Sequence, residues 1–124
     1  MAQKEYDQWR FGYGAGIDFT TGNPTLVSGN SIFSQESAAS VADCFGKLLF
    51  YTDGETVWSK NDGIMDGGTG LNAVSGSYPS TQGCLIVKRP NSSSIYYLFT
   101  ASDIYGVNYS VVNTASLVQR KCSR

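Results

Sequence analysis

No stretch of this chain repeats apolar residues with the 3.6-residue period of an amphipathic helix. Short apolar runs instead alternate with turns that contain glycine, asparagine, aspartate or proline. The 14 glycines supply the conformations that tight turns need, and the eight tyrosines and six phenylalanines favour pleated strands. The sequence therefore predicts an all-β protein of antiparallel sheets, arranged either as the β-propeller-like blades of a partial propeller or as a small β-sandwich.

Turn signals divide the chain into segments of strand length. The first expected strand is bent by its three glycines, and Asp53-Gly54 is a hairpin signal between two later strands. Residues 66–82 are rich in glycine and serine and are expected to form a long loop, while 115–120 would form a helical turn at most. The expected strands are 9–19, 40–44, 48–52, 56–58, 83–88, 95–101 and 107–113.

One apolar strand sequence occurs twice. Leu48-Leu49-Phe50-Tyr51-Thr52 is echoed by Tyr96-Tyr97-Leu98-Phe99-Thr100, 48 residues later. A repeat of this length with several strands per unit is typical of propeller blades, although strands of a sandwich can also resemble one another. We therefore expect a single module over residues 1–124, with two blade-like units at about 9–65 and 83–113 joined by the 66–82 loop.

Seven residues of these strands are expected to supply most of the core. Successive residues of a strand face opposite sides of a sheet, so the pattern allows either Phe50 or Phe99 to point outward. The expected core residues are Leu48, Phe50, Val57, Trp58, Ile86, Tyr97 and Phe99.

Charge and hydropathy exclude several classes of partner. Nine basic and ten acidic residues give a formal net charge of −1, so no broad basic field exists for nucleic acid. No apolar run approaches the 18 residues that span a bilayer, so no membrane insertion is expected. The start at Met1–Glu5 lacks the apolar segment of a signal peptide, which fits either a cytoplasmic protein or a mature secreted start with an added methionine.

The cysteines do not indicate a metal site. The chain has three cysteines, at 44, 84 and 122, and no histidine, and no cysteine pair has metal-ligand spacing. Cys44 and Cys84 stand at the edges of expected strands and could pair, but the odd count favours three reduced cysteines. Both alternatives remain open, and no metal is expected.

No cofactor or catalytic group is expected either. Gly12-x-Gly14-x-Gly16 lacks the spacing of a dinucleotide-binding motif and opens no helix. Ser80, Thr81 and Ser110 carry hydroxyls, but without histidine the usual base for an activated serine is missing, which leaves only a serine–lysine arrangement.

Four residues are candidates for binding a ligand. Asp53 and Asp62 lie in turn sequences; a hairpin turn explains the first better than acid–base chemistry, and the oxygen-rich stretch around the second lacks EF-hand spacing. Tyr78 and Tyr105 lie in polar loops and could serve as platforms for sugar rings, whereas Trp58 is expected in the core.

The motifs of the two expected units resemble the opening region of large secreted β-propeller proteins of Bacteroidetes, which are associated with gliding motility and type IX secretion. The resemblance covers roughly residues 2–113, and Leu48–Trp58 is its most specific part. The residues that carry it are Trp9-Arg10-Phe11-Gly12, Ala15–Phe19, Gly46–Gly54, Val57-Trp58, Ser80-Thr81-Gln82, Ile86-Val87, Pro90, Ile95–Thr100 and Tyr109–Val112.

The resemblance implies an extracellular or cell-surface location after removal of a signal peptide. Members of that family continue for several more blades, and the basic ending Arg120-Lys121 with Arg124 does not match them, so a closed propeller is not expected from this chain. The implied function is that of a non-catalytic structural or interaction module of a secreted, cell-surface β-propeller-type protein.

Two other functions remain as alternatives: a carbohydrate-binding β-domain, which would need two exposed aromatics beside a groove with Asp or Asn, and the propeller part of an enzyme, which would need convergent carboxylates.

The expected partner is another protein or a second copy of the chain, bound through sheet edges, with surface glycans as an alternative. Strands between Gly83 and Asn113 should line the contact, because they hold long apolar stretches with few charges. A lysine at Val111 or Val112, whichever faces outward, should then dissociate the assembly.

Overall fold

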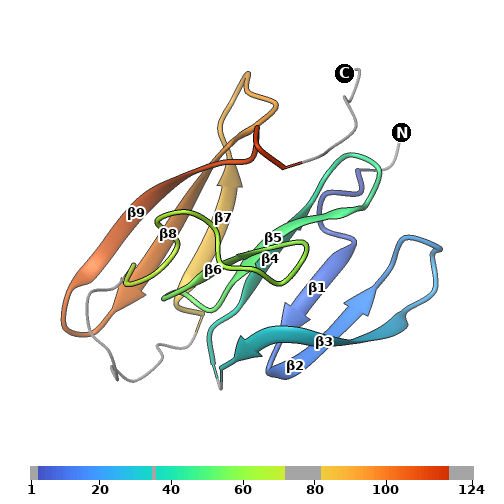
Figure 1. Ribbon diagram of the computed structural model, residues 1–124, viewed down its shortest axis with the longest axis horizontal. Coiled ribbons are helices and arrows are strands. Elements are labelled where there is room, and N and C mark those ends of the chain that lie inside the picture. Colours follow the sequence, from blue (N-terminus) through green and yellow to red (C-terminus); the bar gives the residue numbers. More distant parts are fainter. Residues whose placement is uncertain (1–2, 35, 72–81, 118–124) are drawn as a thin grey trace.

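The computed structural model describes residues 3–34, 36–71 and 82–117 (Figure 1). The described residues form strands, turns and loops, and they contain no helix long and apolar enough to cross a membrane. The nine strands are β1 (Gln8–Phe11), β2 (Tyr13–Asp18), β3 (Thr25–Phe33), β4 (Ala39–Ala42), β5 (Leu48–Thr52), β6 (Val57–Ser59), β7 (Cys84–Lys88), β8 (Ile95–Ser102) and β9 (Gly106–Asn113).

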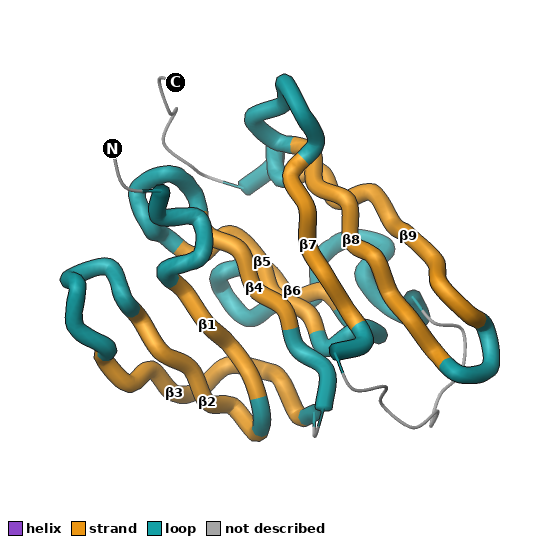
Figure 2. The backbone as a smooth tube through the Cα atoms, turned by 180° about the vertical axis from the view of Figure 1, so that it is seen from behind, coloured by secondary structure: helices purple, strands orange, loops and turns teal. Residues whose placement is uncertain are grey.

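The strands form three antiparallel sheets of three strands each, every one a simple up-and-down meander. We call β1–β3 the first sheet, β4–β6 the middle sheet and β7–β9 the last sheet. The leading strands β1, β4 and β7 lie next to one another in that order, so the sheets form a series, as Figure 2 shows. The predicted all-β fold class of antiparallel sheets, of partial-propeller or sandwich type, is confirmed.

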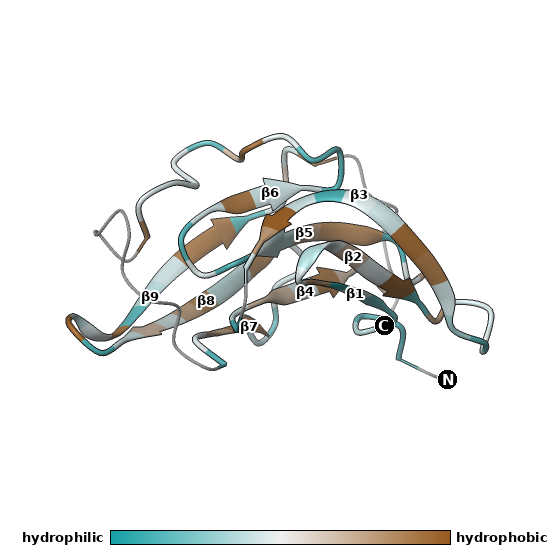
Figure 3. Ribbon diagram, turned by 90° about the horizontal axis from the view of Figure 1, so that it is seen from below, coloured by the Kyte–Doolittle hydropathy of each residue, from teal (hydrophilic) through white to brown (hydrophobic). Residues whose placement is uncertain are grey.

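The core lies between the middle and last sheets. Phe50 and Tyr96 pack edge to face with ring centroids 5.5 Å apart, and neighbouring aliphatic residues close around them. Figure 3 shows apolar stretches recurring along β5, β8 and β9. The buried cluster consists of Val41, Leu49, Phe50, Val57, Ile86, Tyr96, Leu98 and Val112.

The prediction of the core was right for Phe50, Val57 and Ile86 and wrong for the other four residues. In β8 the prediction chose the wrong face: Tyr96 and Leu98 are buried, whereas Phe99 is 37% exposed and Tyr97 is half-buried. Because side chains alternate along a strand, an error of one residue exchanges the buried face for the outer one. In the middle sheet, Leu48 and Trp58 are only half-buried, and Leu49 is buried instead.

Six of the seven expected strands are present within one or two residues of their expected ends. The expectation of one bent strand over 9–19 was wrong. Gly12 adopts φ +63° and turns the chain back on itself, so that Phe11 pairs with Ala15 and the segment forms the β1–β2 hairpin. Strand β3 was not predicted, and residues 9–65 consequently hold two sheets where one blade-like unit was expected.

The segment that follows β6 is not a strand, but it runs beside β6 in the place that a fourth strand of the middle sheet would take. The Met65 amide donates to the Val57 carbonyl (3.0 Å), the Val57 amide to the Gly68 carbonyl (2.7 Å) and the Leu71 amide to the Glu55 carbonyl (3.1 Å). Residues 66–71 of the expected loop are thus anchored to β6, whereas 72–81 lie outside the described residues.

Both expectations for the cysteines, a Cys44–Cys84 disulfide or three reduced thiols, are wrong. Cys44 is disulfide-bonded, but Cys84 is a free thiol and therefore is not its partner. The Cys84 sulfur accepts a hydrogen bond from the Ser37 hydroxyl at 3.2 Å, and burial raises the pKa of the thiol. Cys84 is thus a protonated packing residue at neutral pH.

Candidate functional site

The surface of the last sheet that points away from the middle sheet is apolar. Its residues alternate along the strands with core residues and align across them: Val87 pairs with Tyr97 and Tyr97 with Val111, while Leu85 pairs with Phe99 and Phe99 with Tyr109. We call this surface the outer face and define it as Leu85, Val87, Tyr97, Phe99, Ala101, Val107, Tyr109 and Val111.

The side chains of the outer face are exposed, but contacts among its aromatic rings hold them in place. Val111 is 59% exposed, whereas its neighbour Val112 is 8% exposed and lies in the core. The rings of Tyr97, Phe99 and Tyr109 contact one another with centroids 6.3–6.5 Å apart, which restrains them before any partner binds. No residue of the outer face carries a charge. A contiguous apolar surface of this kind is typical of an interaction site.

A second apolar surface lies at the other end of the series, on the first sheet. Trp9 pairs with Ile17 and Ile17 with Leu26, so these side chains share one side of the sheet. Leu26 is 88% exposed and Trp9 is 51% exposed. The Trp9 indole is held in place because it donates a hydrogen bond to the Tyr6 carbonyl (2.9 Å) and packs against Phe19.

The side of the first sheet that faces the middle sheet is polar. The Tyr51 hydroxyl accepts a hydrogen bond from the Ser31 amide (2.9 Å) and donates one to the Asp62 carboxylate (2.6 Å). Burial and the bond to Asp62 raise the pKa of Tyr51, which therefore stays protonated at neutral pH. Burial lowers the pKa of the nearby Arg10, an effect that Asp18 and Asp62 oppose. This cluster joins the two sheets and leaves no activated nucleophile.

The two aspartates proposed from the sequence have different structural partners. The Asp53 carboxylate accepts hydrogen bonds from the amides of Glu55 and Thr56, both at 2.9 Å, and so builds the β5–β6 turn. Asp62 adopts φ +65° and holds the Tyr51 hydroxyl. A turn thus explains Asp53, and the bond to Tyr51 explains Asp62; neither residue belongs to the strands of the last sheet.

The two proposed tyrosines differ. Tyr105 lies in the β8–β9 turn, where its amide donates to the Ser102 hydroxyl (2.8 Å) and its side chain is about half exposed. Tyr78 lies outside the described residues. The three proposed ligand residues that the structure describes, Asp53, Asp62 and Tyr105, each lie in a different turn.

A cavity of about 500 Å³ lies between β1 and the start of β4, with three aromatic side chains along it. Tyr6, Trp9 and Phe11 are all exposed there, and Arg10 and Gln8 supply its charged and amide groups. The Asp or Asn that a sugar-binding groove was expected to contain is missing from the lining. In the part of the chain that the structure describes, no three His, Cys, Asp or Glu side chains gather to hold a metal ion.

Comparison with known proteins adds no relative: no protein-family model, curated protein or solved structure matches this chain. The resemblance to secreted propeller proteins therefore stays a prediction from the sequence. Surface features are therefore the remaining indication of function, and the outer face is an exposed surface without charged residues.

Proposed function

We propose that this protein is a non-catalytic interaction module of the secreted, cell-surface β-propeller type, and that it self-associates by packing a further β-sheet against the outer face. The single observation that supports the proposal is the outer face itself, eight uncharged residues aligned over three strands. Burial of apolar surface stabilises an interface by about 25 cal/mol per Å², and standard interfaces bury about 800 Å² on each partner.

The chemistry of the outer face fits a sheet better than a small ligand. Small-molecule sites are concave and contain a few convergent polar groups, whereas here only apolar and tyrosine side chains stand on a sheet surface. The opposite side of the same sheet has the same alternation and is covered by the middle sheet. A second sheet packed about 10 Å away is therefore the partner that this geometry favours.

The two alternatives have weaker support. For carbohydrate binding, the cavity beside Trp9 offers exposed aromatics but Arg10 and Gln8 instead of Asp or Asn. For an enzyme, convergent carboxylates are needed, whereas Asp53 stabilises the β5–β6 turn and Asp62 accepts a hydrogen bond from the Tyr51 hydroxyl. We therefore favour an interaction module over both.

Val111→Lys tests this proposal. A lysine in the middle of the outer face would have to lose its hydration on association, so we expect the dissociation constant of the assembly to rise about tenfold or more. Light scattering at increasing protein concentration measures this change. Asn108→Lys is the matched control, because it places the same charge on the same strand but on the other side of the sheet.

The control variant should associate like the wild type. A wild-type chain that stays monomeric at high micromolar concentration would contradict the proposal. An equal loss of association in both variants would also contradict it, since net charge and not the outer face would then be responsible.

A further inference from the structure

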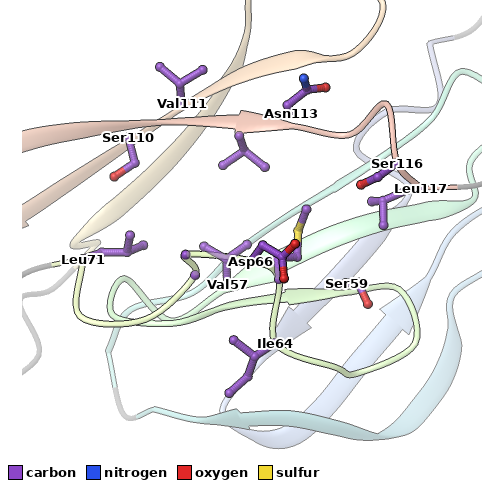
Figure 4. Close-up of a pocket in the computed structure, with 14 residues that line it drawn as sticks. Val57, Ser59, Ile64, Asp66, Leu71, Ser110, Val111, Asn113, Ser116 and Leu117 are labelled. Carbon is purple, nitrogen blue, oxygen red and sulfur yellow. The ribbon is translucent and has the colours of Figure 1, made fainter.

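A cavity of about 470 Å³ opens between β9 and the segment 64–71 that runs beside β6 (Figure 4). Its floor contains the apolar side chains of Val57, Ile64, Met65 and Leu71, together with Ser59, Asp66 and two glycines. In Figure 4, Ser110 points from β9 toward this floor, whereas Val111 points away from it. The cavity therefore lies on the inner side of β9, although Val111 of the outer face is also among the residues that line it.

Strand β9 forms an edge of the last sheet. Among residues 3–34, 36–71 and 82–117, only β8 pairs with it, over the full length of Gly106–Asn113. These eight residues contain no charge and no proline, which are the usual features that protect an edge from pairing. The amides and carbonyls on the far side of β9 are thus suited to pair with another strand.

In the middle sheet, β6 has the position that β9 has in the last sheet, and another segment of the chain pairs with its outer edge. There the segment 64–71 pairs with β6 through the backbone bonds of Val57 with Met65 and Gly68. The last sheet has no such segment beside β9 among the described residues. The 470 Å³ cavity lies directly over the segment 64–71, where the inward side chains of a fourth strand of the last sheet would point.

We propose that an extended peptide from a partner protein adds to the edge of β9 and inserts alternate apolar side chains into this cavity. Backbone hydrogen bonds would supply affinity, and the cavity would select the side chains, as in other cases of strand addition. The exposed Asp66 is the charged residue of the lining and favours a lysine or arginine in the peptide. This site goes beyond the proposed function, because self-association uses the outer face.

A second copy of β9 fits this place less well than a separate peptide. In an antiparallel pair of two β9 strands, the inward positions would be occupied by Asn108, Ser110 and Val112, and only Val112 offers an apolar side chain to Val57, Ile64, Met65 and Leu71. The volume lies within the range of about 300–1,000 Å³ that is usual for ligand pockets, so larger aliphatic or aromatic side chains can enter.

The test uses a display library of random linear peptides, each about twelve residues long to span an eight-residue edge, selected against the immobilised full chain. We expect enriched peptides with apolar residues at alternate positions and a basic residue. A synthetic peptide of the leading sequence should slow amide hydrogen exchange in Gly106–Asn113. Ser110→Phe, which fills the cavity, should weaken its binding about tenfold or more, whereas the control Ser28→Phe, at an exposed position of β3, should not.

A second variant covers the case in which Ser110→Phe fails to fold. Asp66 is exposed, so Asp66→Asn should fold normally and weaken the binding of the basic peptide, most clearly at low salt. The proposal is wrong if no peptide is enriched, if protection falls outside β9, or if both cavity variants bind like the wild type. Slow exchange of β9 amides in a dimer without peptide would show instead that a second copy occupies the edge.

Discussion

Phe50 and Phe99 both lie in the central strand of their sheet, yet they have opposite surroundings. Phe50 is fully buried against Tyr96, whereas Phe99 lies on the outer face beside Tyr109. In the sequence echo Phe50 corresponds to Leu98, and both residues belong to the core between the same two sheets. The repeat thus located two central strands correctly but could not show which side of each strand is buried, because only the packing of neighbouring sheets decides that.

The two phenylalanines allow a matched test of burial. Phe50→Ala should lower the free energy of unfolding by about 3–5 kcal/mol, since it leaves a cavity in the core. Phe99→Ala should cost clearly less, because more than a third of its ring surface is exposed already. Denaturant unfolding at low protein concentration measures both values. Equal costs would mean that the assignment of the two faces is wrong.

At the level of strands, the turn residues made most of the fold predictable and also caused its main error. Asp53-Gly54 marked the β5–β6 turn correctly, because the aspartate carboxylate caps the amides of the turn. Glycines can either bend a strand or turn it, so the β1–β2 hairpin at Gly12 was missed. Strand β3 was missed because polar residues and a glycine interrupt its apolar residues, and pairing with β2 is what holds it extended.

Two glycines with positive φ provide a test of the contact between the first and middle sheets. Gly46 (φ +84°) accepts a hydrogen bond from the Gln8 side chain, and an added Cβ would lie 2.5 Å from the Thr20 methyl group. That methyl group cannot easily rotate away, because the Thr20 hydroxyl donates to Asp18. Gly12 (φ +63°) has open space around it, so its substitution adds backbone strain only.

We therefore expect Gly12→Ala to cost about 1–2 kcal/mol from its left-handed conformation, and Gly46→Ala to cost about 1–3 kcal/mol more from the steric conflict. Thermal or denaturant unfolding of the two variants gives the comparison. Similar losses for both would show that Gly46 is needed only for its turn and not for the close approach of the two sheets.

For the whole molecule, the sequence predicted a contact through sheet edges over Gly83–Asn113, and this contact stays a prediction. The apolar stretches between Gly83 and Asn113 do form the outer face, and the structure identifies Val111 as the outward residue of the Val111-Val112 pair. The cavity beside β9 was not predictable, because it depends on the path of the segment 64–71 and thus on backbone bonds to β6. The apolar surface of the first sheet was not predicted, because it depends on the β1–β2 hairpin that the sequence analysis missed.

The outer face of the last sheet and the apolar surface of the first sheet together predict which surfaces meet when the chain self-associates. Within the chain, each sheet packs against the next in the same order, so continuing the series brings the outer face of one copy against the first sheet of another. Cysteines introduced singly as Leu26→Cys and Tyr109→Cys should therefore cross-link under oxidising conditions when the two variants are mixed, and far less when either is alone. The native Cys84 is a suitable background, because burial raises the pKa of its thiol and slows its reaction. Efficient cross-linking of Tyr109→Cys with itself would instead mean that two outer faces meet in a symmetric dimer.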